Sequence, residues 1–363
     1  MKTMITIHDV AKRAGVSIST VSNVINKNKF VSSDLERRVN AAVQELEYSA
    51  NPIAQKMKSR RTKTIGVISA DLCGLFYPYV LKGMYEVSHS KGYRFIVMDT
   101  EGINDHIGSI KKLKSSMFSL IQDRVDGIVF SSTVPEYLEA SIINDAMKFS
   151  ANKNTAFVCV EKDLSKFGID SVYTNSLLGA DTATSHLIDV GCRKIGHITC
   201  PHYFTVAQDR IEGYRNALAR KGIEVDEARM LANGDYTHRS GYLAMKELLS
   251  KMPDLDGVFS ANDQMAVGAF KALSEVGKRV PEDVKVIGYD DVFIASVLEP
   301  SLSTIHIQKY TMGKKAAELL INQIESNLEY NKHIPSTIEL ESKLIVRKST
   351  VNDAPDDWIL IDW

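Results

Sequence analysis

The stretch ITIHDVAKRAGVSISTVSNVIN, residues 5–26, decides how the chain begins to fold. It predicts a first short helix over Ile7–Ala14 capped by Thr6, and a second over Ile18–Ile25 capped by Ser17, because short hydroxyl side chains favour the position before a helix. Two such helices around a tight turn are typical of the helix-turn-helix, whose second helix enters the DNA major groove. Other small helical hairpins show the same pattern.

The turn and the apolar seam fit the same interpretation. Gly15 directly follows the first helix, where a left-handed backbone carries no steric penalty for glycine. Ala11 supplies the small side chain that two crossing helices need. The seam between the helices consists of valines: Val10, Val16, Val21 and Val24.

The following segment predicts a third helix and a short fourth one. Ser33 and Glu36 have the spacing of a capping box, in which Ser33 caps the helix. Pro52 suits the first turn of the fourth helix, which is too short to be stable alone, and the Lys and Arg around it point to DNA as the partner that orders it. One face of the third helix is apolar: Leu35, Val39, Ala42, Val43 and Leu46.

Charge is unevenly distributed along the chain. The formal net charge of the 363 residues is −1, but residues 1–63 contain twelve Lys and Arg against five acidic residues, so this head carries +7 and the remainder −8. A charge asymmetry between segments is a better guide to partners than the total. The head therefore points to nucleic acid.

Length and composition limit the other possibilities. A chain of 363 residues with 44% hydrophobic content suits two or three folded domains. Four scattered cysteines without a Cys-x-x-Cys pair argue against a disulfide framework and a cysteine zinc site. The start of the chain shows no signal peptide, and no apolar run is long enough to span a membrane. We therefore expect a cytoplasmic protein without a membrane partner.

Residues 5–61 resemble the DNA-binding head of the lactose-repressor/galactose-repressor family of bacterial transcription regulators. The shared run is T-I-x-D-V-A-x-x-A-G-V-S-x-x-T-V-S-x-V-I-N, followed by V-S, R-V and A-x-x-E-L-x-Y-x-x-N-x-x-A. The resemblance implies that the second helix reads bases through Ile18, Ser19 and Asn23. It also implies phosphate contacts from Thr6, Ser17, Ser22, Ser32, Tyr48 and Asn51.

The same resemblance implies a hinge helix over Asn51–Ser59 in the minor groove, with Ala54 and Met57 at the DNA. Relatives wedge a leucine into the central base step, and Met57 stands at that position here. Methionine serves as a softer apolar wedge. Asn23 suits a bidentate contact with adenine, whereas Ile18 suits a thymine methyl group, or alternatively packing on the turn.

From Thr64 onward the pattern changes to alternating strands and helices. Helical stretches include Tyr79–Lys91, Leu177–Val190, Arg210–Lys221 and Gln264–Val276. This alternation predicts parallel sheets with right-handed crossovers, folded as two α/β lobes with a cleft at the carboxyl ends of the strands. Strand-like apolar runs are Ile65–Ser69, Tyr93–Met98, Gly127–Phe130, Ala156–Val160, Ile195–Thr199, Gly257–Ser260 and Val284–Gly288.

Polar residues recur after these strands and predict a polar pocket. Arg210 is expected to open the helix after Ile195–Thr199, whereas Asp209 and Asp263 are interpreted as helix caps. The residues that lie just after strands are Asp71, Glu161, Asn262, Asp290 and Asp291.

The body resembles, more loosely, the periplasmic-binding-protein-like effector domain of the same family, through Arg210–Tyr214, Phe259–Ala269 and Val286–Asp291. This mixture of side chains suits a sugar or a sugar phosphate, whose hydroxyls bond to carboxylates, Arg and Asn. Tyr77 and Tyr236 equally suit a flat nucleobase, and some family members respond to a phosphoprotein. The resemblance implies effector contacts from Asp71, Phe76, Tyr77, Glu161, Arg210, Tyr236, Asn262 and Asp290.

Together these features predict an α/β protein with an all-α helix-turn-helix head and a two-lobed periplasmic-binding-protein-like body with parallel sheets. We expect a DNA-binding domain over 1–50, a hinge helix and linker over 51–63, an effector-binding and dimerisation domain over 64–350, and an acidic tail over 351–363. The tail carries Trp358 and Trp363 and no leucine heptad.

The predicted function is a sequence-specific transcriptional repressor. It binds a palindromic operator as a homodimer and is controlled allosterically by a small-molecule effector. A sugar-binding transport protein and an α/β enzyme acting on sugars are the alternatives. The basic head argues against the first, and the absence of phosphate-binding and nucleophile motifs argues against the second. We expect no cofactor and no metal.

Overall fold

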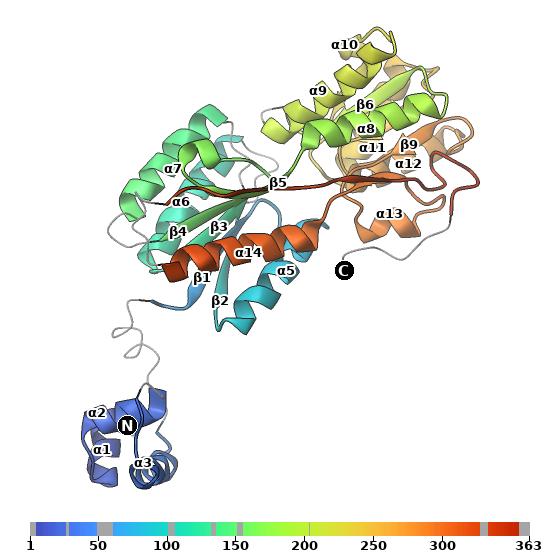
Figure 1. Cartoon of the computed structure of the whole chain (residues 1–363). Helices are drawn as coiled ribbons and strands as arrows, with labels where there is room; N and C mark the ends of the chain where they lie inside the picture. Colours follow the sequence, from blue (N-terminus) through green and yellow to red (C-terminus); the bar gives the residue numbers. More distant parts are fainter. Residues whose placement is uncertain are drawn as a thin grey trace. The chain divides into compact units, whose positions relative to one another are not determined.

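The computed structural model describes residues 5–26, 29–48, 61–100, 106–131, 136–150, 155–202, 204–326 and 333–355. It divides into two compact units, Met1–Thr62 and Lys63–Trp363, which Figure 1 colours along the sequence. The expected hinge contacts Asn51, Ala54 and Met57 lie outside the described residues, as do both tail tryptophans.

The first unit is a bundle of three helices, α1 (Ile7–Ala14), α2 (Ile18–Asn26) and α3 (Ser33–Glu45). The first three predicted helices are therefore present, the first two with boundaries within a residue. The predicted hinge helix over residues 51–59 lies outside the described residues. The predicted seam is also present, because the buried residues of the three helices form one small core: Val10, Ala11, Ala14, Val21, Val24, Val39 and Ala42.

A side chain of α3 stabilises the turn between α1 and α2. Gly15 has a φ of 63°, in the left-handed region, and a Cβ built on it would lie 2.8 Å from Arg38 Nη2. Arg38 Nη2 donates to the carbonyl oxygens of Ala14 (2.8 Å) and Gly15 (3.1 Å). The last carbonyls of α1 thus find a cationic donor, which complements the helix dipole and fixes α1 against α3.

The predicted capping box at Ser33 is wrong by one residue. Ser33 is already the first helical residue, and Ser32 before it has the extended backbone of an N-cap. The carbonyl of Ser32 accepts the first intrahelical bond from Glu36 N–H at 3.0 Å. A capping box does form at α1, where the backbone N–H of Thr6 donates to Asp9 Oδ2 at 2.8 Å.

The second unit consists of two α/β lobes. The first lobe has a parallel six-stranded sheet in the order β11-β5-β4-β3-β1-β2. Its helices cover both faces, as expected for a parallel sheet. The strands are β1 (Thr64–Ser69), β2 (Arg94–Asp99), β3 (Gly127–Ser131), β4 (Ala156–Val160), β5 (Asp170–Thr174) and β11 (Thr337–Leu340).

Alternate residues of these strands enter two separate cores. Val67, Val129 and Val158 belong to the core that includes residues of α5 (Tyr77–Ser90) and α14 (Lys309–Ser326). On the other face, Ile68, Ile128 and Phe157 pack with α6 (His106–Gln122) and α7 (Glu136–Ser150).

Helices α5 and α14 cross closely at glycines. A Cβ on Gly83 would lie 2.0 Å from the carbonyl oxygen of Tyr310, and one on Gly313 would lie 1.9 Å from that of Val80. Any larger residue at either position would push the two helices apart. This crossing fixes α14, which enters the first lobe from the second (Figure 1).

The second lobe has a parallel sheet in the order β7-β6-β8-β9. Its strands are β6 (Ile195–Thr199), β7 (Leu231–Asn233), β8 (Gly257–Ser260) and β9 (Lys285–Ile287). The longer helices of this lobe are α8 (Ser176–Asp189), α9 (Thr205–Arg220), α11 (His238–Lys251) and α12 (Asp263–Glu275), with the short α10 (Glu227–Met230) and α13 (Phe293–Val297) between them.

The chain passes between the lobes three times within the described residues. The passages lie between β5 and α8, between β10 (Thr304–His306) and α14, and between β11 and β12 (Lys343–Ile345). Strands β10 and β12 pair antiparallel beside the second lobe. The two C-terminal passages therefore run next to each other.

The predicted fold is confirmed, with several corrections of detail. All seven predicted strands form, although Val284–Gly288 shortens to Lys285–Ile287. Strands β5, β7, β10, β11 and β12 were not predicted. Helix α9 begins at Thr205, so Arg210 lies in its second turn and does not open it. In the part of the chain that the structure describes, no helix has the length and apolar character to cross a membrane.

Candidate functional site

Helix α2 of the head presents a polar surface opposite its buried seam. Val21 and Val24 are buried, whereas Ile18 and Ser19 are exposed, Ile18 by 38%. Ser22 and Asn23 lie one turn further along and are half-buried. Because helix residues four apart share a face, these four side chains form one strip. The strip has the residues expected to meet DNA.

The remaining expected DNA contacts of the described head are also at its surface. Ser17 caps α2 as predicted, because its Oγ accepts from Thr20 N–H at 3.1 Å. Thr6 and Ser32 are exposed before α1 and α3, and Tyr48 is half-buried after α3. Hydroxyls at helix starts are suited to holding backbone phosphates.

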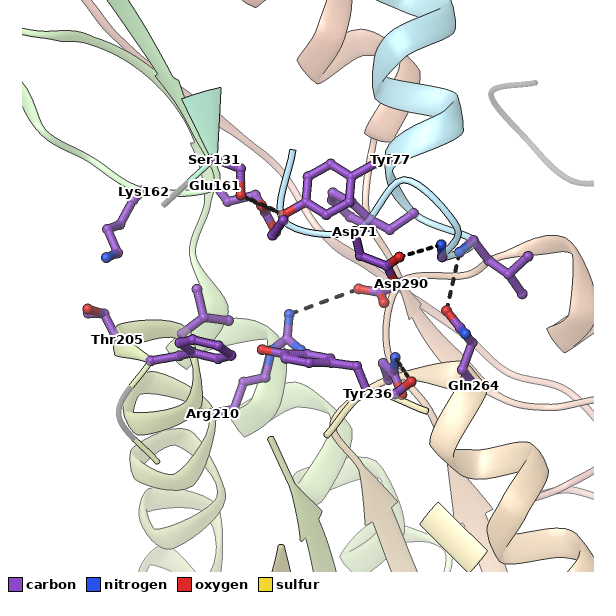
Figure 2. A pocket seen from close by; sticks show the side chains of 17 residues that line it. Asp71, Tyr77, Ser131, Glu161, Lys162, Thr205, Arg210, Tyr236, Gln264 and Asp290 are labelled. Carbon is purple, nitrogen blue, oxygen red and sulfur yellow. Dashed lines mark hydrogen bonds and ion pairs between the residues drawn. The ribbon is translucent and has the colours of Figure 1, made fainter. Parts of the chain in front are cut away.

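The body contains a pocket between its two lobes, at the carboxyl ends of the strands of both sheets (Figure 2). Such a position is typical of ligand sites in open α/β folds. The structure brings all eight expected effector contacts together in the lining: Asp71, Phe76, Tyr77, Glu161, Arg210, Tyr236, Asn262 and Asp290.

The wall from the first lobe is organised around Glu161. The hydroxyl of Ser131 donates to Glu161 Oε2 at 2.8 Å, and the hydroxyl of Tyr77 donates to the same oxygen. Burial raises the pKa of the Glu161 carboxyl above its ordinary value and raises the pKa of Tyr77 well above its own. This wall therefore presents a pre-positioned carboxyl group with little water around it.

The wall from the second lobe is organised around Arg210, which is only 6% exposed. Its Nη1 donates to the carbonyl of Ala261 at 2.5 Å, and its Cζ lies 3.9 Å from the ring centre of Tyr289. Nη2 lies 3.9 Å from Asp290 Oδ1, and Nε has no hydrogen-bond partner among the described residues. The guanidinium is thus held in place with donor capacity to spare.

The N-terminus of α12 holds two neighbouring loops. Asn262 is the N-cap, accepting from Met265 N–H at 2.8 Å, and its Nδ2 donates to the carbonyl of Tyr236 at 3.1 Å. Asp263, interpreted as a cap from the sequence, is instead fully buried and accepts from Val292 N–H at 2.9 Å. Asp209 is not a cap either, because it lies inside α9.

Two consecutive residues with positive φ carry the last acidic groups, Asp290 (φ 102°) and Asp291 (φ 54°). Lys309 holds their backbone, since its Nζ donates to both carbonyls. Asp291 points away from the pocket lining and pairs with His306 (2.9 Å) and Arg347 (2.8 Å). His306 is the last residue of β10, and Arg347 follows β12, so Asp291 joins the two strands that pair beside the second lobe.

The pKa values of the Asp290 and Asp291 carboxyl groups are shifted in opposite directions. Burial raises the pKa of Asp290 to about 7, which the positive charge of Arg210 only partly opposes. Burial also acts on Asp291, but the hydrogen bond from His306 and the charge of Arg347 outweigh it and lower the pKa. Asp291 is therefore an anion stabilised by its two partners. The charged form of Asp290 is destabilised by burial, and its carboxyl group lines the pocket where a ligand would bind.

Several lining residues were missed by sequence reasoning: Ser131, Lys162, Phe204, Thr205 and Gln264. Ser131 and Lys162 lie at the ends of β3 and β4, and the rule that found Glu161 applies to them too. Thr205 and Gln264 lie at helix starts, where the sequence shows no distinctive pattern. Among the described residues, no group of three or more His, Cys, Asp or Glu is placed to hold a metal.

Two family descriptions match the chain. "Bacterial regulatory proteins, lacI family" matches residues 6–51, which contain the helical head. "Periplasmic binding protein-like domain" matches residues 184–350, which contain most of the second lobe and α14.

Two curated relatives match nearly the whole chain. The ribose operon repressor of Escherichia coli (strain K12) is 37% identical over 323 residues, which cover 88% of this chain and 93% of that protein. The HTH-type transcriptional repressor PurR of Serratia proteamaculans (strain 568) is 36% identical over 354 residues, which cover 97% and 98%.

Solved structures show the same architecture. The Lac repressor dimer bound to operator and the anti-inducer ONPF has a TM-score of 0.83 and 25% identity, over 96% of this chain and 99% of that one. The complex of the transcriptional regulator CelR with cellobiose has a TM-score of 0.68 and 31% identity, over 95% and 99%.

Proposed function

This chain belongs to the lacI family of bacterial regulatory proteins, and we propose that it represses transcription by binding operator DNA under the control of an effector held in the pocket. Its relatives are transcriptional repressors, so the prediction that it is not an enzyme is confirmed. The observation that carries the proposal is that a basic helix-turn-helix head and a polar pocket between two lobes occur in one chain.

The head is proposed to read DNA as one half of a symmetric dimer. Two copies meet a palindromic operator, because protein symmetry is mirrored by two half-sites. The solved Lac repressor is a dimer on its operator, which supports this arrangement. Base reading is assigned to Ile18, Ser19 and Asn23, and phosphate contacts to the hydroxyls around them. We propose a cytoplasmic location, which is consistent with binding to operator DNA.

The effector is proposed to be a sugar. Carboxyl groups from Asp71, Glu161 and Asp290 converge with the Arg210 guanidinium and the Asn262 amide on one pocket. These groups donate to and accept from hydroxyls, while the stacked rings of Phe204 and Tyr236, 6.0 Å apart, offer an apolar face. The bound cellobiose in the CelR structure and the ribose operon repressor among the relatives support this class.

A nucleobase is the second candidate. Tyr77 and Tyr236 come from opposite walls of the pocket (Figure 2), so a flat ring would fit between them. The similarity to PurR favours this reading. The hydrogen bond from the Tyr77 hydroxyl to Glu161 instead makes this wall polar, which favours sugar hydroxyls.

The effector is proposed to act by changing the angle between the lobes. A ligand shifts this equilibrium only by its unequal affinity for the two arrangements, and such coupling amounts to about 1–3 kcal/mol. The test is selection of a binding site from random duplex DNA by the full-length protein, followed by titration with D-ribose or adenine. We expect a palindromic site and release or tightening by D-ribose. Failure to enrich any DNA sequence would contradict the repressor proposal. A change in operator binding with adenine but not with D-ribose would show that the pocket binds a nucleobase.

Asn23→Ala is expected to weaken binding to the selected operator by about 1–3 kcal/mol and to relax specificity at one base pair per half-site. A bidentate contact to a base edge would be lost, while phosphate contacts would stay. Dissociation constants on the operator and its single-base variants measure this effect. Asn40→Ala, an exposed asparagine of α3, is the matched control. Equal losses on all operator variants would assign Asn23 to the backbone.

A further inference from the structure

The backbone amides of the loop after β1 donate to acceptors on both lobes. The amide of Asp71 donates to Ser69 Oγ, and that of Leu72 donates to Asp99 Oδ2. Asp71 Oδ1 accepts from the amides of both Cys73 and Gly74, each at 2.9 Å. Four consecutive amides thus find acceptors inside the first lobe.

The fifth amide finds its acceptor on the other lobe. Leu75 N–H donates to Gln264 Oε1 at 3.2 Å, although the two residues are 189 positions apart (Figure 2). Gln264 is the second residue of α12, next to Asp263, whose carboxyl group accepts hydrogen bonds from Val292 N–H and the Thr304 hydroxyl. Its side chain therefore extends from a fixed backbone to the loop of the other lobe, at the lining of the pocket.

We propose that Gln264 is a positioning residue that latches the loop 71–76 of the first lobe onto the second lobe. Opening the lobes would leave Leu75 N–H without its protein acceptor, so the latch favours the closed arrangement before any effector arrives. The loop carries Asp71 and Phe76 into the pocket lining, and the latch therefore sets where these side chains meet a ligand. This inference rests on the proposed effector site, but the hydrogen bond can be tested without an effector.

The alternative role for Gln264 is direct contact with the effector, because it lines the pocket. The two roles differ in the ligand-free protein. A latch protects the Leu75 amide from solvent when no effector is present, whereas a ligand contact has no effect in that state. A single variant measured without and with ligand separates them.

The experiment is amide hydrogen exchange on the full-length, effector-free protein, read at the segment 71–76. Gln264→Met keeps the unbranched side chain but removes the acceptor, and we expect the Leu75 amide to exchange at least about fivefold faster. Gln264→Glu keeps an acceptor oxygen and is expected to retain the protection. Gln208→Met, at an exposed glutamine that bonds within the second lobe, is the matched control and is expected to leave the segment unchanged.

Unchanged exchange in Gln264→Met would overturn the latch. A D-ribose titration of the same variants distinguishes the remaining outcomes. Weaker D-ribose binding with unchanged exchange assigns Gln264 to direct contact and leaves the proposed effector site standing. Faster exchange in a protein whose parent does not bind D-ribose supports the latch and rejects the sugar.

Discussion

Replacing Arg347 with methionine is expected to lower the free energy of unfolding of the body by about 3–5 kcal/mol. Arg347 and Asp291 are each only 3% exposed, and their charged atoms lie 2.8 Å apart. Methionine fills much of the space but leaves the carboxylate of Asp291 buried without its guanidinium partner and with only the hydrogen bond to His306. An uncompensated buried charge costs far more than the net contribution of the pair. Urea unfolding of the full-length protein measures the change.

The matched control is Arg279→Met, which removes the same charge from an exposed pair. Arg279 is 70% exposed and pairs with Asp283, four positions further along the turn before β9, at 3.1 Å. Such exposed pairs contribute about 0–1 kcal/mol. The double change Asp291→Asn with Arg347→Met is expected to recover part of the loss, because neither charge is then stranded. Similar losses in Arg347→Met and the control would show that the buried pair contributes no more to stability than the exposed one.

Strands that are continuous apolar runs between turn residues were predicted most accurately. Ala156–Val160, Ile195–Thr199 and Gly257–Ser260 form with the predicted boundaries. The missed strands β7, β10, β11 and β12 have three or four residues each. The interior strand β5 (Asp170–Thr174) was missed because its sequence, D-S-V-Y-T, is not an apolar run. Thr337–Leu340 is partly exposed and becomes a strand by pairing with β5, more than 160 positions earlier. Local pattern carries no information about such a partner.

The pocket shows the same division between local and long-range information. Polar residues after strands were predictable, because the carboxyl ends of parallel strands meet at one edge. The roles of Asn262 and Asp263 were not, since both residue types cap helices equally well. Thr304 and Val292, 41 and 29 positions away, decide that Asp263 turns inward. Gln264 was missed for a similar reason, because its partner Leu75 belongs to the other lobe.

Asp290→Asn is expected to stabilise the effector-free protein at pH 8 while weakening effector binding. Burial raises the pKa of Asp290 to about 7, well above the ordinary value of 3.8. The folded state therefore holds the proton more tightly than the unfolded state, so the wild type loses stability as the pH rises from about 4 to about 7. Asparagine carries no charge to desolvate, and it tolerates the positive φ of this position.

The stability difference between variant and wild type is expected to be small at pH 4 and to grow to a few kcal/mol at pH 8, since each pKa unit corresponds to about 1.4 kcal/mol. Urea unfolding of both proteins across this range measures it. Asp283→Asn is the control with the opposite sign, because Arg279 lowers the pKa of exposed Asp283 to about 2, and its loss should reduce stability at pH 8.

The same Asp290→Asn substitution tests whether the strained carboxylate serves binding. A hydrogen bond to a charged group contributes about 1.5–3 kcal/mol, so affinity for D-ribose should fall by at least about tenfold at pH 8. At pH 5 the wild-type carboxyl is largely protonated, and the two proteins should bind more nearly alike. Stability gained together with affinity lost would show that the fold tolerates a costly buried charge for the sake of its ligand. A variant that is less stable at pH 8 would mean that the folded protein favours the charged form, and the pKa would then lie below its ordinary value.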